Sequence, residues 1–189
     1  MSRAWRSTTE VCTRFLVMPI VVGILCATVS ANAEAPQGSR MTDEYQVKAA
    51  FLYNFAKFVQ WPASDDKARP FTMCVFGDDA FVVVLQQIAG GKSVQGRDLV
   101  VRTVSAEEEA RACQILFIGE AEARHTRDLL AVATGWAVLT VGETMPFLRD
   151  GGLVRFYVEG NRLRFQINVE GVQQAGLKVS SQLLGIAKQ

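Results

Sequence analysis

The feature that most constrains the fold is an alternation of short apolar runs with helical segments between residues 71 and 141. Each run is rich in β-branched or aromatic residues, which predicts a buried strand. Helices are expected between them, over residues 79–88, 106–111 and 121–133. The four predicted strands are residues 71–76, 99–104, 115–118 and 137–141. Strands that alternate with helices form parallel βαβ units, so a largely parallel sheet is predicted.

The C-terminal third has a different pattern. Two further strands, 153–158 and 162–168, flank Glu159-Gly160-Asn161, which is a hairpin signal. A helical turn over 169–174 and a final helix ending at residue 187 follow. The expected fold class is α/β: a three-layer sandwich with a mostly parallel sheet, an antiparallel C-terminal hairpin and helices on both faces. Residues 41–189 contain no long linker and are expected to form one domain.

An aromatic helix is expected before the first strand. Thr42 or Asp43 would cap it, and Pro62 would end it at residue 61, because a residue before proline resists the helical conformation. The inward face is predicted to carry Val47, Phe51, Phe55, Phe58 and Val59. The outward face is predicted to carry Lys48, Asn54 and Lys57.

The N-terminus has the features of a secretory signal peptide over residues 1–33. Three arginines precede an apolar run at 15–29, which closes on Ala31-Asn32-Ala33. An uncleaved membrane anchor is the alternative, although the run is shorter than the roughly twenty residues a spanning helix needs. Residues 34–40 are expected to be a disordered lead. The mature chain would lie outside the cytoplasm and be close to neutral, which is unlike the basic footprint of a nucleic-acid-binding protein.

Cys74 and Cys113 are the two cysteines left after cleavage. In an oxidising compartment they can form one intramolecular disulfide; two buried free thiols are the alternative. Closing this loop would stabilise the fold by up to about 4 kcal/mol in the chain-entropy model. A sheet in which the first strand lies between the second and the third would bring the two residues together.

No catalytic, cofactor-binding or metal site is predicted. The single histidine, His125, has no cysteine or carboxylate at ligand spacing. Gly91-Lys92-Ser93 lacks the earlier glycine and the preceding strand of a phosphate-binding loop. Gly77-Asp78-Asp79 has one of three dinucleotide-binding glycines, and helix capping by the aspartates explains it better. Ser180 has no nucleophile-elbow glycines around it.

Two groups of residues are candidates for a partner surface. Tyr45, Tyr53 and Trp61 lie off the inward face of the aromatic helix, and exposed aromatic residues often mark interfaces. The second group lies on short C-terminal elements that can bury little by themselves. It consists of Val169, Val172, Leu177 and Val179. Plain core packing is the alternative for both groups.

Several blocks of the sequence resemble the YfiR family of periplasmic regulators. The first is EYQVKAAFLYNFAKFVQWP at 44–62, and the later ones follow in the family's order over nearly all of the mature chain. These are CQILFIGE (113–120), VLTVGE (138–143), GGLVRFYVEGNRLRFQIN (151–168) and LKVSSQLLGIA (177–187).

The resemblance implies a regulator rather than an enzyme. The best-known family member holds a membrane-bound diguanylate cyclase inactive by binding its periplasmic sensory region, and an outer-membrane lipoprotein sequesters it. By resemblance, this chain would lower cyclic diguanylate signalling and biofilm formation, and a homodimer is a further expectation. Cys74 and Cys113 match one family cysteine pair; a second pair is absent. The alternative function is a periplasmic small-ligand sensor.

Overall fold

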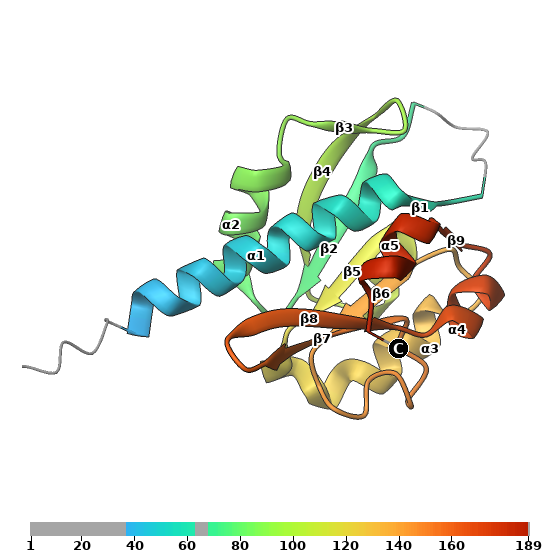
Figure 1. The fold of residues 1–189 in the computed structure, drawn as a ribbon. Helices are drawn as coiled ribbons and strands as arrows, with labels where there is room; N and C mark the ends of the chain where they lie inside the picture. The colour runs from blue at the N-terminus through green and yellow to red at the C-terminus, as the bar shows by residue number, and fades with distance from the viewer. Residues whose placement is uncertain (1–36, 63–67, 189) are drawn as a thin grey trace, which may run out of the picture. The chain divides into compact units, whose positions relative to one another are not determined.

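The computed structural model describes residues 37–62 and 68–188. The centre of the fold is a seven-stranded sheet (Figure 1). The predicted signal peptide, residues 1–33, and residues 34–36 of the predicted lead lie outside the described part. The strand order is β3-β4-β2-β5-β6-β7-β8. The strands are β2 (Phe71–Phe76), β3 (Ser93–Val94), β4 (Arg97–Val104), β5 (Ile115–Ile118), β6 (Leu139–Gly142), β7 (Val154–Glu159) and β8 (Arg162–Ile167).

The sheet confirms the predicted α/β class. Strands β4, β2, β5, β6 and β7 are parallel, and the edge strands β3 and β8 are antiparallel to their neighbours. The predicted first strand, β2, lies between the second and the third, as expected. Strand β2 is buried along its whole length, with alternate residues in two separate clusters of the core. Such burial explains its continuous apolar sequence.

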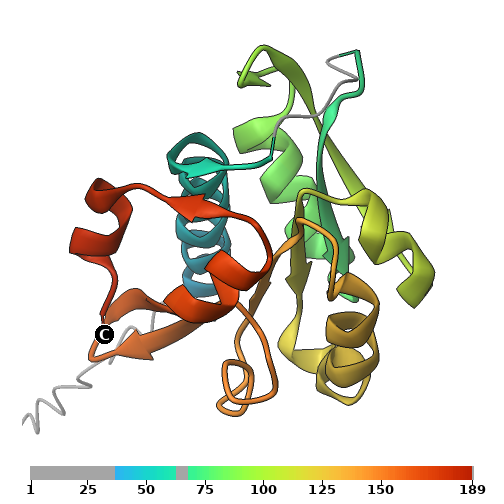
Figure 2. The same cartoon turned by 90° about the vertical axis from the view of Figure 1, so that its right-hand side faces the viewer.

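Helices cover both faces of the sheet (Figure 2). Helices α1 (Gln37–Phe58) and α2 (Asp79–Ala89) pack on one face, where they share a core cluster with β2. On the other face lie two 3₁₀ helices, η1 and η2, and helix α3. Their bounds are Glu107–Ala112 for η1, Glu120–His125 for η2 and Thr126–Ala133 for α3. The three-layer arrangement is therefore confirmed.

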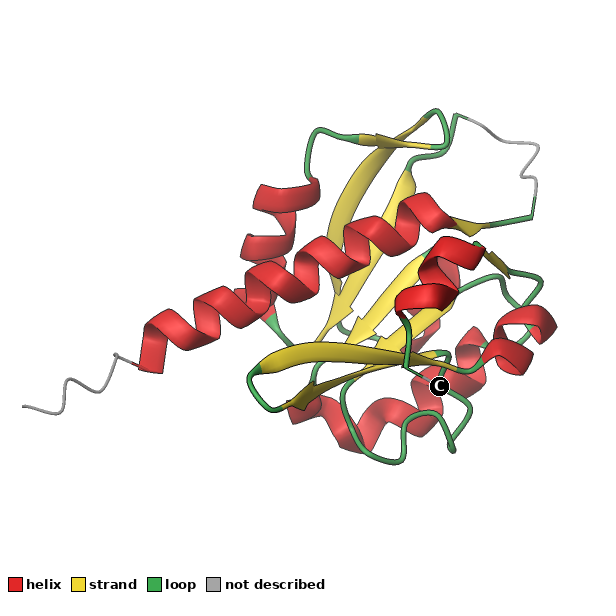
Figure 3. Ribbon diagram, in the orientation of Figure 1, coloured by secondary structure: helices red, strands yellow, loops and turns green. Residues whose placement is uncertain are grey.

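The C-terminal segment returns to the end of α1. Helix α4 (Val169–Gln174) matches the predicted turn, and α5 (Ser181–Ile186) is the final helix. Between them, β9 (Lys178–Val179) pairs antiparallel with β1 (Val59–Gln60), which directly follows α1 (Figure 3). This pairing was missed, since two-residue strands carry no periodic signal and residues 59–61 were assigned to the helix. Pro62 accounts for the extended backbone before it.

Helix α1 differs from its prediction at its start and in its buried face. It begins at Gln37, so residues 37–40 of the expected disordered lead are helical. Glycine and serine have a lower helix propensity than alanine, by up to about 1 kcal/mol per residue, and a helix of this length can tolerate that loss of stability. Val47 is 44% exposed whereas Lys48 is only 5% exposed, which reverses their predicted faces. The apolar face is centred on Leu52, Phe55 and Val59, and Lys48 extends it by helical spacing.

Two further predicted elements are corrected. Residues 121–133 are not one α-helix: residues 120–125 form the 3₁₀ helix η2, in which Glu122 leaves helical dihedrals (φ −101°, ψ 23°), and α3 begins only at Thr126. The loop after α2 contains the missed strand β3. Gln95 (φ 54°) and Gly96 (φ 75°) turn this strand into β4, as positive φ at both central residues allows.

A glycine pair shapes the loop after β6. The Phe147 ring is buried between Gly142 and Gly152, and a Cβ on either glycine would overlap that ring. We expect Gly142→Ala to lower the free energy of unfolding by about 1–3 kcal/mol, the usual cost of overpacking. Urea denaturation of the variant and the wild type measures this loss of stability. The control is Gly185→Ala in α5, where the added methyl meets open space and should stabilise by up to about 1 kcal/mol. Equal effects of the two substitutions would contradict this packing argument.

Candidate functional site

Acidic side chains follow three neighbouring parallel strands where each strand ends. Asp78 comes two residues after β2, Glu120 two residues after β5, and Glu143 directly after β6. The carboxyl ends of parallel strands meet at one edge of a sheet, where open α/β folds bind ligands. This edge is therefore the first candidate site of the molecule.

Lys48 of α1 reaches this edge and is buried there. Its Nζ forms ion pairs with Glu143 and with Glu44, one helical turn before it. Burial opposes the charge of Lys48, but the hydrogen bonds to Glu143 and Glu44 together outweigh it and raise its pKa. Burial also raises the pKa of Glu143, against the opposing effect of Lys48. Both raised pKa values favour the protonated forms of Lys48 and Glu143, whose side chains meet between α1 and β6.

Tyr45 joins the same edge to the start of α2. Its hydroxyl donates to Asp78 Oδ2 at 2.8 Å, and Asp78 Oδ1 accepts from the Phe81 backbone N–H at 3.0 Å. The predicted capping role of Asp78 is thus confirmed. Burial, followed by the hydrogen bond to Asp78, raises the pKa of Tyr45 to about 12. Tyr45 therefore stays a neutral hydrogen-bond donor at physiological pH.

A cavity of about 250 Å³ opens beside Glu143. Two residues of β7 supply its unusual chemistry: the Arg155 Nε and the Tyr157 hydroxyl are buried and have no hydrogen-bond partner among the described residues. Its lining residues are Glu44, Glu120, Glu143, Met145, Arg155, Phe156, Tyr157, Val158 and Leu163.

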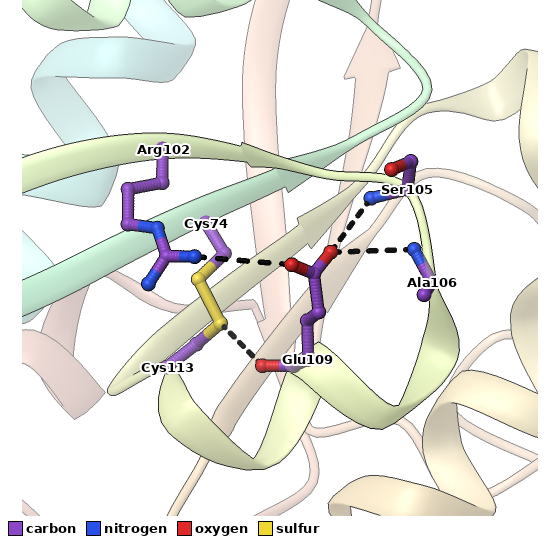
Figure 4. A network of polar contacts seen from close by, with 6 residues as sticks. All are labelled: Cys74, Arg102, Ser105, Ala106, Glu109 and Cys113. Atoms are coloured by element: carbon purple, nitrogen blue, oxygen red, sulfur yellow. Dashed lines mark hydrogen bonds and ion pairs between the residues drawn. A yellow bond between two sulfur atoms is a disulfide. The ribbon is translucent and has the colours of Figure 1, made fainter.

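Cys74 and Cys113 form the predicted disulfide, with their Cα atoms 5.8 Å apart (Figure 4). Cys74 lies in β2 and Cys113 directly follows η1, and both are buried. The bond therefore joins a central strand to the 3₁₀ helix that covers it. A disulfide of this kind fits an oxidising compartment.

The loop beside the disulfide is fixed by Glu109 (Figure 4). Its carboxylate accepts from the backbone N–H of Ser105 at 3.1 Å and of Ala106 at 3.3 Å, and Arg102 lies 3.8 Å away. These two backbone hydrogen bonds lower the pKa of Glu109. Cys113 Sγ is 3.5 Å from the carbonyl oxygen of Glu109, so the same residue borders both the loop and the disulfide.

The three aromatic candidates for a partner surface are half-buried and take part in packing. The Tyr45 ring contacts Phe81, with 5.3 Å between ring centroids. The Trp61 ring packs edge-on against Phe71 at 4.8 Å, and its Nε1 donates to the Gln114 carbonyl at 3.2 Å. Tyr53 has Lys92 over its ring at 4.3 Å. They do not form one exposed aromatic patch, and any role in binding stays a prediction.

The C-terminal candidates divide into two pairs. Val172 and Leu177 are 1% exposed and belong to the main core, whereas Val169 is 39% exposed and Val179 is half-buried. All four still border one cleft of about 240 Å³ between α4, β9 and α5. The cleft is lined by Val169, Val172, Gln173, Leu177, Lys178, Val179 and Leu184. The structure therefore brings these predicted residues together, with Val169 and Val179 at the accessible side.

The other sequence candidates have structural roles. His125 is one-third exposed rather than free on the surface, because its Nδ1 lies 3.0 Å from Glu107 Oε1 and its ring packs on Phe76. Ser180 caps α5 by accepting from the Leu183 N–H at 3.3 Å. Within residues 37–62 and 68–188, no group of three or more histidine, cysteine or acidic side chains could hold a metal ion. None of the helices in those ranges is long and apolar enough to cross a membrane.

Sequence reasoning missed the charged residues of the strand-end edge. Lys48 was assigned to the solvent, and Glu143, Arg155 and Tyr157 were not singled out. The acidic residues that follow β5 and β6 were visible in the sequence, in the blocks ending at Glu120 and Glu143. An acidic residue after each of several parallel strands is a signal that could have located this edge.

Comparison with known families gives a match over most of the chain. The family described as YfiR/HmsC-like matches residues 45–188. This range includes α1 from Tyr45 onward, the whole sheet and, except for Glu44, every lining residue of the two cavities described above. The matched range covers well over half of the chain, and it agrees with the resemblance of the separate sequence blocks. The chain therefore belongs to the YfiR/HmsC-like family.

Proposed function

We propose that this protein is a periplasmic regulator that represses a membrane-bound diguanylate cyclase by binding the periplasmic sensory region of that enzyme. The family match over residues 45–188 is the observation that carries the proposal. The Cys74–Cys113 disulfide supports an oxidising compartment such as the periplasm. Repression would lower cyclic diguanylate and biofilm formation. The proposal includes two further partners: an outer-membrane lipoprotein that sequesters this protein, and a second copy of this protein.

The cleft between α4, β9 and α5 is the proposed contact for the cyclase. Its floor is apolar and fully buried at Val172 and Leu177, and Val169 is accessible at its side. Lys178 and Gln173, both exposed, supply polar groups around it. An apolar centre with a polar rim is the usual composition of a protein interface.

A charge at Val169 tests this contact. We expect Val169→Glu to weaken binding by about tenfold or more, because an unpaired carboxylate would be buried against the partner. Cells lacking the chromosomal gene would carry the wild-type or the variant precursor, and cyclic diguanylate would be measured by mass spectrometry. The variant should leave the nucleotide as high as in the deletion strain. Val172→Glu is unsuitable, since Val172 is in the core.

The matched control is Val83→Glu, at a 54% exposed valine of α2. It should repress as the wild type does, and immunoblots should show equal amounts of both variants in the periplasm. Full repression by Val169→Glu would remove the α4–β9 cleft from the interface. An unchanged nucleotide level in the deletion strain itself would overturn the regulatory proposal.

A second candidate function is the sensing of a small ligand. The cavity at the carboxyl ends of β5 and β6 favours it, because α/β proteins bind ligands at this edge. Two of its lining residues, Arg155 and Tyr157, each also have a buried polar atom without a partner among the described residues. Sensing and repression are compatible, since the strand-end cavity and the α4–β9 cleft share no lining residue.

A further inference from the structure

The strand-end cavity is small and contains charges of both signs. Its volume of about 250 Å³ lies just below the range of about 300–1,000 Å³ that is usual for ligand pockets. Its volume therefore favours a metabolite of a few carbon atoms over a nucleotide. Glu120 and Glu143 border the cavity together with Arg155, so its chemistry is neither purely acidic nor purely basic.

The acidic side of the cavity has an excess of negative charge. Three carboxylates line it, and the ammonium of Lys48 is shared by two of them, Glu44 and Glu143. Glu120 is exposed and has no ion-pair partner among the described residues. Its negative charge acts on Glu143, where it contributes to the raised pKa. A protonated amine placed between Glu120 and Glu143 would relieve this repulsion.

The basic side is a guanidinium with weak partners. Arg155 Nη2 donates to Gln166 Oε1 at 2.8 Å, but Nη1 faces the Met145 Sδ at 2.8 Å and Nε has no partner within residues 37–62 and 68–188. A thioether is a weak acceptor, and Met145 is 81% exposed and free to move aside. The Tyr157 ring centroid lies 5.2 Å from the guanidinium, and its buried hydroxyl also lacks a partner in the part of the chain that the structure describes. A carboxylate would satisfy this arginine far better than methionine does.

We propose that the strand-end cavity binds a small zwitterion, with its protonated amine at Glu120 and Glu143 and its carboxylate at Arg155. A purely cationic ligand would meet the guanidinium, and a purely anionic one would meet the carboxylates, so each is disfavoured by a like charge. This inference rests on the second candidate function and not on cyclase repression.

Matched four-carbon compounds test the inference. Protein purified from the periplasm would be titrated calorimetrically with 2-aminobutyrate, 4-aminobutyrate, butylamine and butyrate. We expect at least one of the two zwitterions to bind, and butylamine and butyrate to bind at least about tenfold more weakly, as loss of one charge-assisted contact implies. Binding of neither zwitterion, or equal binding of butylamine, would overturn the proposal.

A substitution in the cavity supplies the second arm. Glu120 is exposed, so Glu120→Gln should fold normally, and it should weaken zwitterion binding by about tenfold. Glu170→Gln, the same change at an exposed position of α4, is the control and should leave binding unchanged. Full affinity in Glu120→Gln would also overturn the proposal. Because the purified protein is measured without the cyclase, a negative result would leave the repression proposal standing.

Discussion

Replacing Phe55 with alanine is expected to lower the free energy of unfolding by about 3–5 kcal/mol, the usual cost of deleting a buried phenylalanine ring. Phe55 is fully buried where α1 meets the C-terminal hairpin. Its ring stacks on Phe156 at 5.8 Å between centroids and packs edge-on against Phe165 at 5.1 Å. Both contacts join the start of the domain to β7 and β8, so the loss affects the whole fold.

Thermal unfolding followed by circular dichroism measures this effect. For a domain of this size, each kcal/mol of lost stability lowers the melting temperature by about 2–4 °C, so the melting temperature should fall by roughly 6–20 °C. Phe58→Ala, three residues later on α1, is the matched control. Phe58 is half-buried, and its loss should cost only about 1–2 kcal/mol. If the two substitutions had equal effects, Phe55 would not be the centre of the contact between α1 and the hairpin.

The sheet could be predicted because its central strands are buried on both faces. Such strands read as continuous apolar runs, as residues 71–76 and 115–118 do, and the helices between them imply parallel pairing. The placement of β2 between β4 and β5 then brought Cys74 and Cys113 together as expected. The hairpin of β7 and β8 was equally clear from its turn.

The errors have local physical causes. Strands β1, β3 and β9 have two residues each, which is too short for any periodicity. On α1 the predicted apolar face was rotated by about one residue, because Val47 was preferred over Lys48 on hydrophobicity alone. Single-residue hydrophobicity takes no account of an ionic partner, and the less exposed of the two partners of Lys48, Glu143, is 95 residues away. The pairing of these two residues depends on the folded sheet.

The candidate site was harder to predict than the fold for the same reason. Glu143 directly follows β6, Arg155 lies in β7 and Lys48 lies in α1, so no short motif contains them. The C-terminal valines were recognised as a group, but which of them is core depends on how α4 packs. The structure places Val172 inside and leaves Val169 accessible.

Replacing Lys48 with methionine is expected to lower the free energy of unfolding by about 3–5 kcal/mol, because Glu143, whose side chain is only 16% exposed, is left without its cation. Glu44, the other partner of Lys48, is 43% exposed in its side chain and can be solvated by water. The control is Lys57→Met, at an exposed lysine of the same helix, which should change stability by less than about 0.5 kcal/mol. Urea denaturation at neutral pH compares the two.

The loss in Lys48→Met should also depend on pH, with a sign fixed by Glu143. Burial already raises the pKa of Glu143 above its ordinary value of 4.5, and removal of Lys48 removes the interaction that opposes this rise. A group with a raised folded-state pKa stabilises the fold below its unfolded pKa, and this contribution disappears as pH rises through the folded pKa. The variant should therefore be closest to wild type below about pH 4.5 and lose stability as pH rises through the raised pKa of Glu143. Adding Glu143→Gln should remove this pH dependence, since the glutamine side chain does not ionise. A pH-independent loss in Lys48→Met would show that lost packing, rather than the buried charge of Glu143, is what the lysine prevents.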